Sequence, residues 1–237
     1  MFNRDQLLVA KDQWNECGYA VIDNFIQEPY YSALSEYVRR LQYGVWHCIH
    51  NNHKQYPASF VGTNEYHELH KQFLQDSKGE FSYWHYAHWL LRDYHKVDSN
   101  PLVTEFNQTV TKVDDNPFTD LCRGIIGQYD MYTNEPTYSY YNHKSWLNAH
   151  HDPDRYCAYI FYFNDNWQTH WGGQLCILDK DEKTIKYSVE PTGNRIVLLN
   201  VQAQEGQRVN KHFISPVSIT ADEPRYSLAG WFYPKKK

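Results

Sequence analysis

Long apolar runs are absent from the sequence. The longest, Cys157–Phe163, has about seven residues, whereas a membrane-spanning helix needs about 20. The N-terminal residues also lack the apolar stretch of a secretory signal peptide. We therefore expect a soluble, cytoplasmic protein with no membrane partner.

Basic charge and cysteine are also scarce. The 23 Lys and Arg residues are outnumbered by 28 Asp and Glu residues, for a formal net charge of −5. The basic face of a nucleic-acid-binding domain is therefore not expected. The cysteines number five, an odd count, and none are spaced as CxxC. This pattern is typical of reduced thiols and argues against a disulfide-built scaffold.

Aromatic side chains and histidines are abundant instead. The chain has 21 Tyr, 8 Trp and 13 His, and aromatic residues make up 17% of it. Tyr and Trp combine an apolar ring with a hydrogen-bonding group. Such a chain can build an enclosed but polar pocket, although a compositional bias alone gives the same numbers.

The first half of the chain favours helices. Residues 44–82 have no regular pattern and are rich in Tyr, His and Asn. Apolar spacing and capping signals predict the other elements. The predicted helices cover 5–16, 28–42, 83–95 and 101–113, and a strand lies within 19–26.

From about residue 119 the pattern changes to short β-rich runs separated by turn signals. With no helices between them, such runs indicate a sandwich, a jelly roll or a barrel. We expect an N-terminal region, 1–118, to pack on a β domain, 119–237. The predicted strands are Ile125–Tyr132, Tyr156–Asn164, Gly173–Leu178, Ile185–Val189, Arg195–Asn200, His212–Ile219 and Arg225–Phe232.

A candidate metal site lies within the β-rich part. His150 and Asp152 are two residues apart, so in an extended segment both side chains face the same side. His212 follows Asp152 by 60 residues, which suits strands that are neighbours in a jelly roll. Two histidines and a carboxylate form the facial triad of non-haem Fe(II). His151 should face away, and Asp154 does not complete the same spacing.

A candidate anion site follows in the last predicted strand. Arg225 and Ser227 are two residues apart, so they share a face of the strand. A guanidinium grips a carboxylate through two hydrogen bonds, and it is costly to bury without an anion. A dicarboxylate cosubstrate would meet this need.

These motifs together resemble the Fe(II)- and 2-oxoglutarate-dependent oxygenases, in the prolyl-4-hydroxylase-like branch. The resemblance covers residues 120–234, and 20–25 resembles the family's first strand. The matching motifs are His150-x-Asp152, Trp167 with Trp171-Gly172-Gly173-Gln174-Leu175, Glu190-Pro191-x-x-Asn194-Arg195, His212 with Pro216-Val217, and Arg225-x-Ser227-x-x-Gly230-Trp231. The resemblance implies a mostly β fold with N-terminal helices (α+β), built on a double-stranded β-helix (jelly roll, cupin-like) core.

The same resemblance implies roles for individual residues. The metal ligands would be His150, Asp152 and His212. The distal carboxylate of 2-oxoglutarate would be bound by Arg225, Ser227 and Tyr162. A second pocket tyrosine would be Tyr140 or Tyr141, and Trp231 would be an aromatic beside the cosubstrate. The Gly172-Gly173 pair would form a turn that lets strands pack closely.

The activity that the resemblance implies is hydroxylation of an unactivated C–H bond with release of succinate and CO2. Its cofactors would be Fe(II), 2-oxoglutarate and O2, with ascorbate as a reductant. The expected substrate is a peptidyl or free proline. The alternatives are a tailoring oxygenase for another small molecule (hydroxylation, desaturation or cyclisation) and a non-catalytic metal-binding jelly-roll module. The carboxylate of Asp152 favours hydroxylation over halogenation.

Other aromatic and histidine clusters carry weaker hypotheses. Residues 80–86 are the densest aromatic stretch and are predicted to form a pocket wall within the 44–95 segment. Two histidine pairs, His67/His70 and His85/His88, would each share a helix face and pack there. The His47–His53 run could bind zinc, but its spacing fits no standard closed site.

Overall fold

The computed structural model is built around an antiparallel sheet. The model describes residues 1–41, 46–50, 54–56, 63–76, 83–89, 100–112, 116–152, 154–201 and 210–235. The sheet has twelve strands in the order β1-β10-β7-β12-β5-β4-β6-β11-β8-β9, with β2 paired to β4 and β3 to β2. The strands are β1 (Tyr19–Asp23), β2 (His47–His50), β3 (Lys54–Tyr56), β4 (Tyr83–Trp89), β5 (Met131–Tyr141), β6 (Trp146–His150), β7 (Cys157–Tyr162), β8 (Leu175–Leu178), β9 (Ile185–Val189), β10 (Arg195–Asn200), β11 (His212–Ile214) and β12 (Arg225–Pro234).

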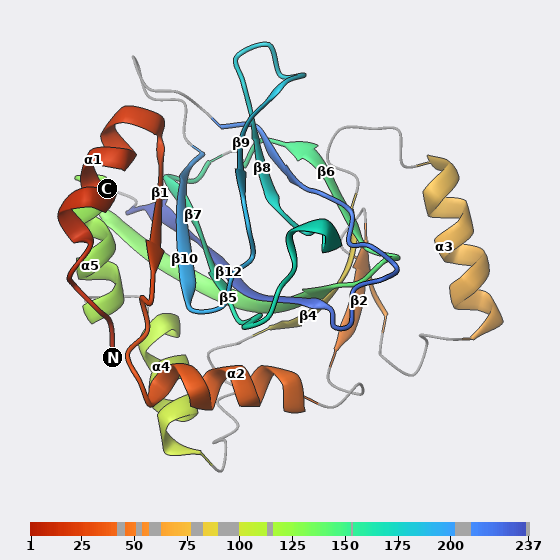
Figure 1. Cartoon of the computed structure of the whole chain (residues 1–237), viewed down its shortest axis with the longest axis horizontal. Helices are drawn as coiled ribbons and strands as arrows, with labels where there is room; N and C mark the ends of the chain where they lie inside the picture. The colour runs from red at the N-terminus through yellow and green to blue at the C-terminus, as the bar shows by residue number, and fades with distance from the viewer. Residues whose placement is uncertain are drawn as a thin grey trace.

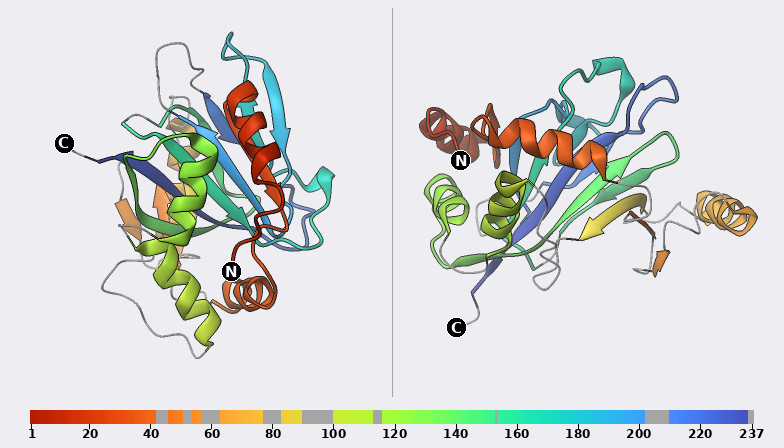
Figure 2. Two further views of the ribbon diagram at one scale, coloured as in Figure 1. Left: turned by 90° about the vertical axis from the view of Figure 1, so that its left-hand side faces the viewer. Right: turned by 90° about the horizontal axis from the view of Figure 1, so that it is seen from below.

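Four helices cover one side of the sheet, at the left and bottom of Figure 1. The side view in Figure 2 shows α1 and α5 lying across the β1 end of the sheet. A fifth helix, α3, stands apart at the other side of the molecule (Figure 1). None of the described helices has the length and apolarity to cross a membrane. The helices are α1 (Leu7–Cys17), α2 (Tyr30–Arg40), α3 (Asn64–Asp76), α4 (Pro101–Thr111) and α5 (Pro117–Ile126).

The alternation of side chains along the strands divides the core in two. On β7, the odd-numbered residues from Cys157 to Phe161 pack in the cluster beneath the helices. The even-numbered residues from Ala158 to Tyr162 pack in a second cluster between the two halves of the sheet. Because successive side chains of a strand face opposite sides, a strand covered on both sides is apolar throughout. This second cluster is the interior of the jelly roll.

The predicted fold class is confirmed, as a mostly antiparallel β structure flanked by helices. The strands Ile185–Val189 and Arg195–Asn200 have the predicted bounds. Helix α1 ends at Gly18, whose φ of 73° is left-handed as a helix C-cap requires. Of the predicted late strand His212–Ile219, only the first three residues are β structure.

Three predictions of local structure were wrong. The helix predicted over 83–95 is strand β4 over its described residues, Tyr83–Trp89. The irregular segment 44–82 contains β2, β3 and α3. The strand predicted over Ile125–Tyr132 overlaps helix α5, which is capped by Asn116 and by the left-handed Gly127. The strand that follows, β5, starts only at Met131.

Strand β4 comes from the N-terminal part of the chain but lies between β5 and β6 in the sheet. It pairs with β5 through Tyr86↔Tyr140 and the residues after it, and with β6 through Tyr83↔Leu147. His85 and His88 belong to a strand, so the predicted common helix face of this pair was wrong. His70 of α3 packs edge-on against Trp84 of β4, with ring centroids 4.9 Å apart.

Candidate metal centre and anion pocket

Two adjacent strands and one loop bring the three candidate metal ligands together. His150 ends β6, His212 begins β11, and the two residues are direct partners across this strand pair. Asp152 follows two residues after His150. One ligand atom from each residue lies within 4.8 Å of the other two. All three side chains are buried, with 6%, 2% and 5% of His150, Asp152 and His212 exposed.

Backbone carbonyls fix the orientation of both imidazole rings. Nδ1 of His150 lies 2.8 Å from the carbonyl oxygen of Asn148, and Nδ1 of His212 lies 3.0 Å from that of Asn210. A carbonyl oxygen can only accept, so Nδ1 carries the hydrogen and Nε2 keeps its lone pair. The two Nε2 atoms lie 3.8 and 3.7 Å from the carboxylate oxygens of Asp152.

The surroundings of His150 keep its imidazole in the neutral form that can bind a metal. Burial, followed by the neighbouring His212, lowers the pKa of His150 to about 4. A neutral imidazole is the form that ligates a cation. The described donors are two nitrogens and one carboxylate on one side, a set that fits Fe(II) with open coordination positions.

Arg155 and Trp231 hold the carboxylate of Asp152 from the other side. The indole Nε1 of Trp231 donates to one carboxylate oxygen at 3.0 Å, and Arg155 donates to the other at 3.2 Å. The guanidinium of Arg155 lies over the Trp231 ring, 4.5 Å from its centroid. These contacts fix the carboxylate in one orientation, as outer partners of metal ligands commonly do.

Arg225 occupies the far end of the same cavity. Only 1% of this residue is exposed. Its guanidinium donates to Ser227 Oγ at 3.2 Å and to the Tyr162 hydroxyl at 3.3 Å. Its Nε has no hydrogen-bond partner among the described residues, and none of the described carboxylates forms an ion pair with it. A buried cation in this state calls for an anionic ligand.

The two tyrosines beside Arg225 remain hydrogen-bond donors. Burial raises the pKa of Tyr141 and of Tyr162 above that of an ordinary phenol. The hydroxyl of Tyr162 accepts from Arg225, so its own hydrogen is available to an anion. The guanidinium lies 5.1 Å from the ring centroid of Tyr141 and 4.9 Å from that of Tyr162.

The strand register distinguishes between the two candidate tyrosines. On β5, Tyr141 pairs with Arg225 and lines the cavity. Tyr140 faces the opposite side and packs edge-on against Trp46, with ring centroids 4.9 Å apart. Tyr141 therefore belongs to the anion pocket, and Tyr140 belongs to the core beneath the helices.

One cavity joins the metal ligands to the anion pocket. Residues of β5, β6, β7, β8, β11 and β12 line it from both halves of the sheet. The lining residues are Ser139, Tyr141, Leu147, His150, Asp152, Ala158, Tyr159, Ile160, Leu175, His212, Ile214, Arg225, Ser227, Ala229, Gly230 and Trp231. Tyr162 is not among the lining residues, but it pairs with Ser227 and its hydroxyl accepts from Arg225.

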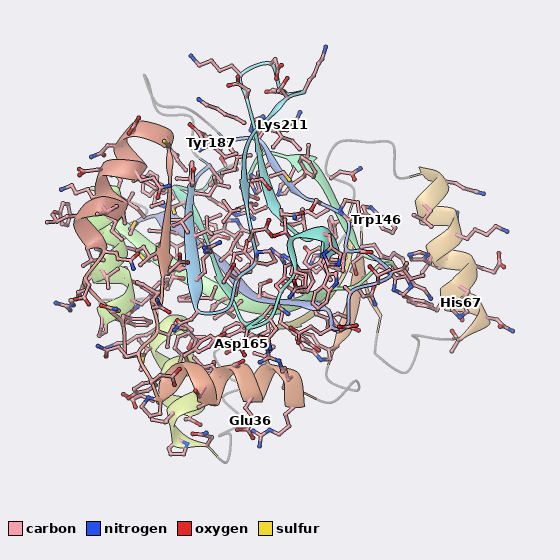
Figure 3. All side chains as sticks on the ribbon, in the orientation of Figure 1. Glu36, His67, Trp146, Asp165, Tyr187 and Lys211 are labelled. Carbon is pink, nitrogen blue, oxygen red and sulfur yellow. The ribbon has the colours of Figure 1, made fainter. Side chains whose placement is uncertain are left out.

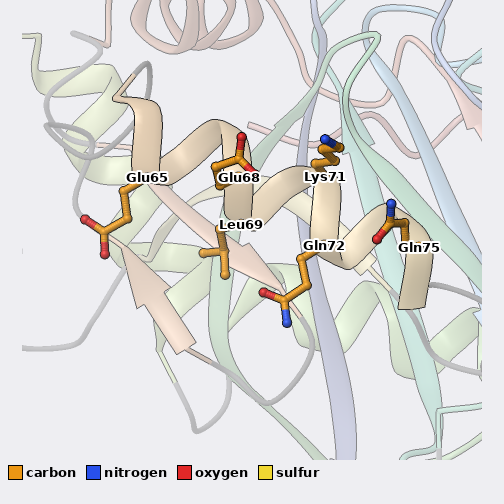
Figure 4. Close-up of a pocket in the computed structure, with 6 residues that line it drawn as sticks. All are labelled: Glu65, Glu68, Leu69, Lys71, Gln72 and Gln75. Carbon is orange, nitrogen blue, oxygen red and sulfur yellow. The ribbon is translucent and has the colours of Figure 1, made fainter.

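A second hollow runs along α3, and the described residues that line it include neither a histidine nor an arginine. Figure 4 shows the residues that line it, all from this one helix. They are Glu65, Glu68, Leu69, Lys71, Gln72 and Gln75. No residue of another described element faces them there, so the hollow is a poor place to hold a substrate.

Several other sequence-based candidates lie elsewhere. The His151 side chain is 39% exposed and lies 3.4 Å from Glu182, facing away from the three ligands. Asp154 is exposed. Of the predicted pocket wall 80–86, residues 80–82 fall outside the described residues, and Trp84 is buried beneath the helices. For the His47–His53 run, the structure describes no side chain.

Sequence reasoning missed one residue beside the cavity. Arg155 could have been found because it follows Asp152 by three residues, which lets it reach the carboxylate. His85 belongs to the predicted pocket wall 80–86, although the helix predicted there is strand β4. Its ring stacks on Tyr141 at 4.8 Å between centroids, with 15° between planes. Burial and the charge of Arg225 lower the pKa of His85 to about 3.

Comparison with known proteins gives one family. Residues 128–233 match the family model described as the 2OG-Fe(II) oxygenase superfamily. This range includes all three candidate metal ligands and Arg225. No curated protein matches the sequence.

Solved structures share the fold along nearly the whole chain. A Pseudomonas putida prolyl-4-hydroxylase is 18% identical, with 97% of this chain and 100% of that chain covered and a TM-score of 0.58. A Trichoplax adhaerens prolyl hydroxylase, in complex with a hypoxia-inducible factor peptide fragment, is 18% identical over 97% and 89% of the two chains, with a TM-score of 0.63. The α-ketoglutarate-dependent epimerase SnoN from nogalamycin biosynthesis is 10% identical over 96% and 82%, with a TM-score of 0.51. At these identities the likeness shows the fold alone.

Proposed function

We propose that the chain belongs to the 2OG-Fe(II) oxygenase superfamily, whose family model matches residues 128–233, and that it hydroxylates an unactivated C–H bond with release of succinate and CO2. One observation carries this proposal. A single cavity contains a buried cluster of two histidines and a carboxylate at one end and a buried arginine without an ion-pair partner among the described residues at the other.

The metal end is assigned to His150, Asp152 and His212. Bound Fe(II) supplies the activation of O2 and the oxidation of the C–H bond. The protein residues hold the metal from one side, because both Nε2 atoms face the carboxylate of Asp152. Trp231 and Arg155 occupy the outer side of that carboxylate and keep it from turning away.

The other end is assigned to the distal carboxylate of 2-oxoglutarate. Arg225 offers a charged pair of donors, and the neutral hydroxyl of Tyr162 adds another beside it. Ser227 and Tyr141 complete the pocket. The bound carboxylate would remove the electrostatic cost of a buried, unpaired guanidinium. The cosubstrate would therefore be anchored at the end away from the metal.

The substrate proposed first is a prolyl residue, peptidyl or free. The solved structures that support it are prolyl hydroxylases, one of them in complex with a peptide. Trp231 lines the cavity and donates to Asp152, so it lies beside the ligands that such a residue would have to approach. Ascorbate is proposed as the reductant that keeps the metal ferrous.

A tailoring oxidation of another small molecule is the second candidate. The observation behind it is that an epimerase from nogalamycin biosynthesis shares the fold over 96% of this chain. A non-catalytic metal-binding module is the third. It gives no reason for a buried Arg225 in the cavity that holds the three ligands.

The test is a substrate screen with two linked readouts. Protein loaded with Fe(II) is incubated with 2-oxoglutarate, O2, ascorbate and a panel of prolyl peptides, free proline and small metabolites. The account predicts succinate formation that one class of substrate stimulates, with a product 16 mass units heavier. Succinate that no substrate stimulates, with wild-type protein well folded and loaded, would contradict the hydroxylase proposal.

A further inference from the structure

Asn164, just after β7, bonds to the chain on both sides of Arg225. Its side chain is fully buried. The amide Nδ2 donates to a carboxylate oxygen of Glu223 and to the carbonyl oxygen of Pro224, each at 2.9 Å. The amide Oδ1 accepts from the backbone N–H of Tyr226 at 2.7 Å. A single amide therefore fixes residues 223, 224 and 226 at once.

These bonds continue the contact between β7 and β12 beyond the end of their ladder. The paired residues of that ladder stop at Ser227↔Tyr162, so Arg225 has no partner on β7. Asn164 lies two residues after Tyr162 and reaches the chain around Arg225 instead. The amide thus adds to the backbone bond from Phe163 N–H to the carbonyl oxygen of Tyr226 and to the pairing of Arg225 with Tyr141 on β5. Together these contacts hold Arg225 and Tyr162 in one frame.

The same network extends to the N-terminal helix α2. The other carboxylate oxygen of Glu223 pairs with Arg39 of α2 at 3.3 Å, and Arg39 pairs with Asp165 at 3.2 Å. Asp165 also accepts from the hydroxyl of Tyr31. Figure 3 labels Asp165 where the loop after β7 faces α2. Because these ion pairs are partly exposed, each contributes little alone, and Asn164 is the buried member.

We infer that Asn164 is a positioning residue for the cosubstrate, which acts by fixing the backbone from which Arg225 projects. This inference rests on the proposed function of the anion pocket. A bidentate grip on a carboxylate depends on the angle of the guanidinium plane. Supporting hydrogen bonds determine whether such a group is held within a productive range. Without the amide, Arg225 keeps its charge but loses its fixed direction.

Asn116 provides a matched control. It is 2% exposed, and its side chain makes three hydrogen bonds, as Asn164 does. Its partners are Lys112, which follows α4, and Thr119 in the first turn of α5, in a different part of the fold. Asn164→Ala and Asn116→Ala should therefore lose comparable stability, while only the first touches the chain around Arg225.

The experiment measures the Kd of 2-oxoglutarate for Fe(II)-loaded protein under anaerobic conditions, together with the Kd of Fe(II) and the Tm. We expect Asn164→Ala to raise the Kd of 2-oxoglutarate about tenfold or more, which is about 1.4 kcal/mol. Both variants should lower the Tm, and the Kd of Fe(II) should stay within about twofold in each. Asn116→Ala should bind 2-oxoglutarate like the wild type.

One milder variant keeps the test decisive if Asn164→Ala does not fold. Glu223→Ala removes one of the three bonds and should give a smaller rise. An unchanged Kd of 2-oxoglutarate in the folded variants would overturn the inference. Failure of the wild type to bind 2-oxoglutarate would instead overturn the proposed function itself.

Discussion

At the scale of single residues, the two candidate histidine ligands are oriented before any metal binds. The carbonyl oxygens of Asn148 and Asn210 hold their Nδ1 atoms, so each ring has only Nε2 to offer. Asp152 completes the group, with its carboxylate fixed by Trp231 and Arg155. The site is therefore largely preorganised, and its residues should act on ligand binding more than on folding.

Substitution of Asp152 tests the metal assignment. Asp152→Ala removes one of three ligands, so we expect it to lose tight Fe(II) binding and all turnover while remaining folded. The matched control is Asp154→Asn, an exposed neighbour with φ of 64° that tolerates asparagine. Equilibrium dialysis with Fe(II) and thermal melting check both variants. An unfolded Asp152→Ala would count against a role confined to the metal.

Substitution of Arg225 tests the anion pocket. Arg225→Ala leaves the cosubstrate carboxylate buried without its cation, which costs about 3–5 kcal/mol, or more than a hundredfold in Kd. Fe(II) affinity should change little. Arg123→Ala removes another buried arginine, one that bonds to Asp120 and Met131, and serves as the control. Cosubstrate affinity equal to that of the wild type would refute the assignment.

The protonation of His85 should make the stability of the fold depend on pH. Its pKa is lowered to about 3 in the fold and is near 6.5 in an unfolded chain. Between these values the unfolded state binds a proton that the native state does not, so stability is full above pH 6.5 and decreases as the pH falls.

His85→Phe keeps the stack on Tyr141 and removes this titration. Between pH 7 and pH 5 we expect the variant to lose on the order of 2 kcal/mol less than the wild type. Urea unfolding at the two pH values measures the difference. Equal losses in both proteins would mean that His85 is not held neutral in the fold.

At the scale of elements, turns and caps were partly readable from sequence, and strand β4 was not. The Asn116-Pro117 start and the Gly127 end of α5 are ordinary helix signals, which were overridden by the apolar run at 125–126. In β4, aromatic side chains occupy both faces, since Tyr83 and Trp84 are both buried. The sequence of β4 therefore shows no alternation of apolar and polar residues, and its pairing with β2, β5 and β6 makes this segment a strand.

Replacing either of two glycines by alanine should have opposite effects on the stability of the protein. A Cβ on Gly172 would lie 2.0 Å from the carbonyl oxygen of Pro216, and its φ is 75°. We expect Gly172→Ala to destabilise the protein by about 2 kcal/mol or more. A Cβ on Gly124 of α5 meets nothing within 4 Å, so Gly124→Ala should stabilise by about 0.5–1 kcal/mol. Denaturant unfolding distinguishes the two, and equal effects would contradict this packing.

At the scale of the whole molecule, the sequence predicted the jelly roll and the residues that the structure gathers in one cavity. The spacing of His150 and Asp152 and the paired Arg225 and Ser227 were sufficient, because residues two apart on a strand share a face. The choice between Tyr140 and Tyr141 was not predictable, because it depends on the register of β5 against β12. The contacts of His85 with Tyr141 and of Asn164 with Glu223 join different elements, which spacing does not reveal.

The central claim is that one cavity binds a metal at one end and 2-oxoglutarate at the other. An anaerobic titration of the metal-free protein with Fe(II) and then 2-oxoglutarate, followed by visible absorption, tests it without a known substrate. The account predicts a saturable charge-transfer band that is lost in Asp152→Ala and that needs far more 2-oxoglutarate in Arg225→Ala. A folded wild-type protein that gives no band would contradict it.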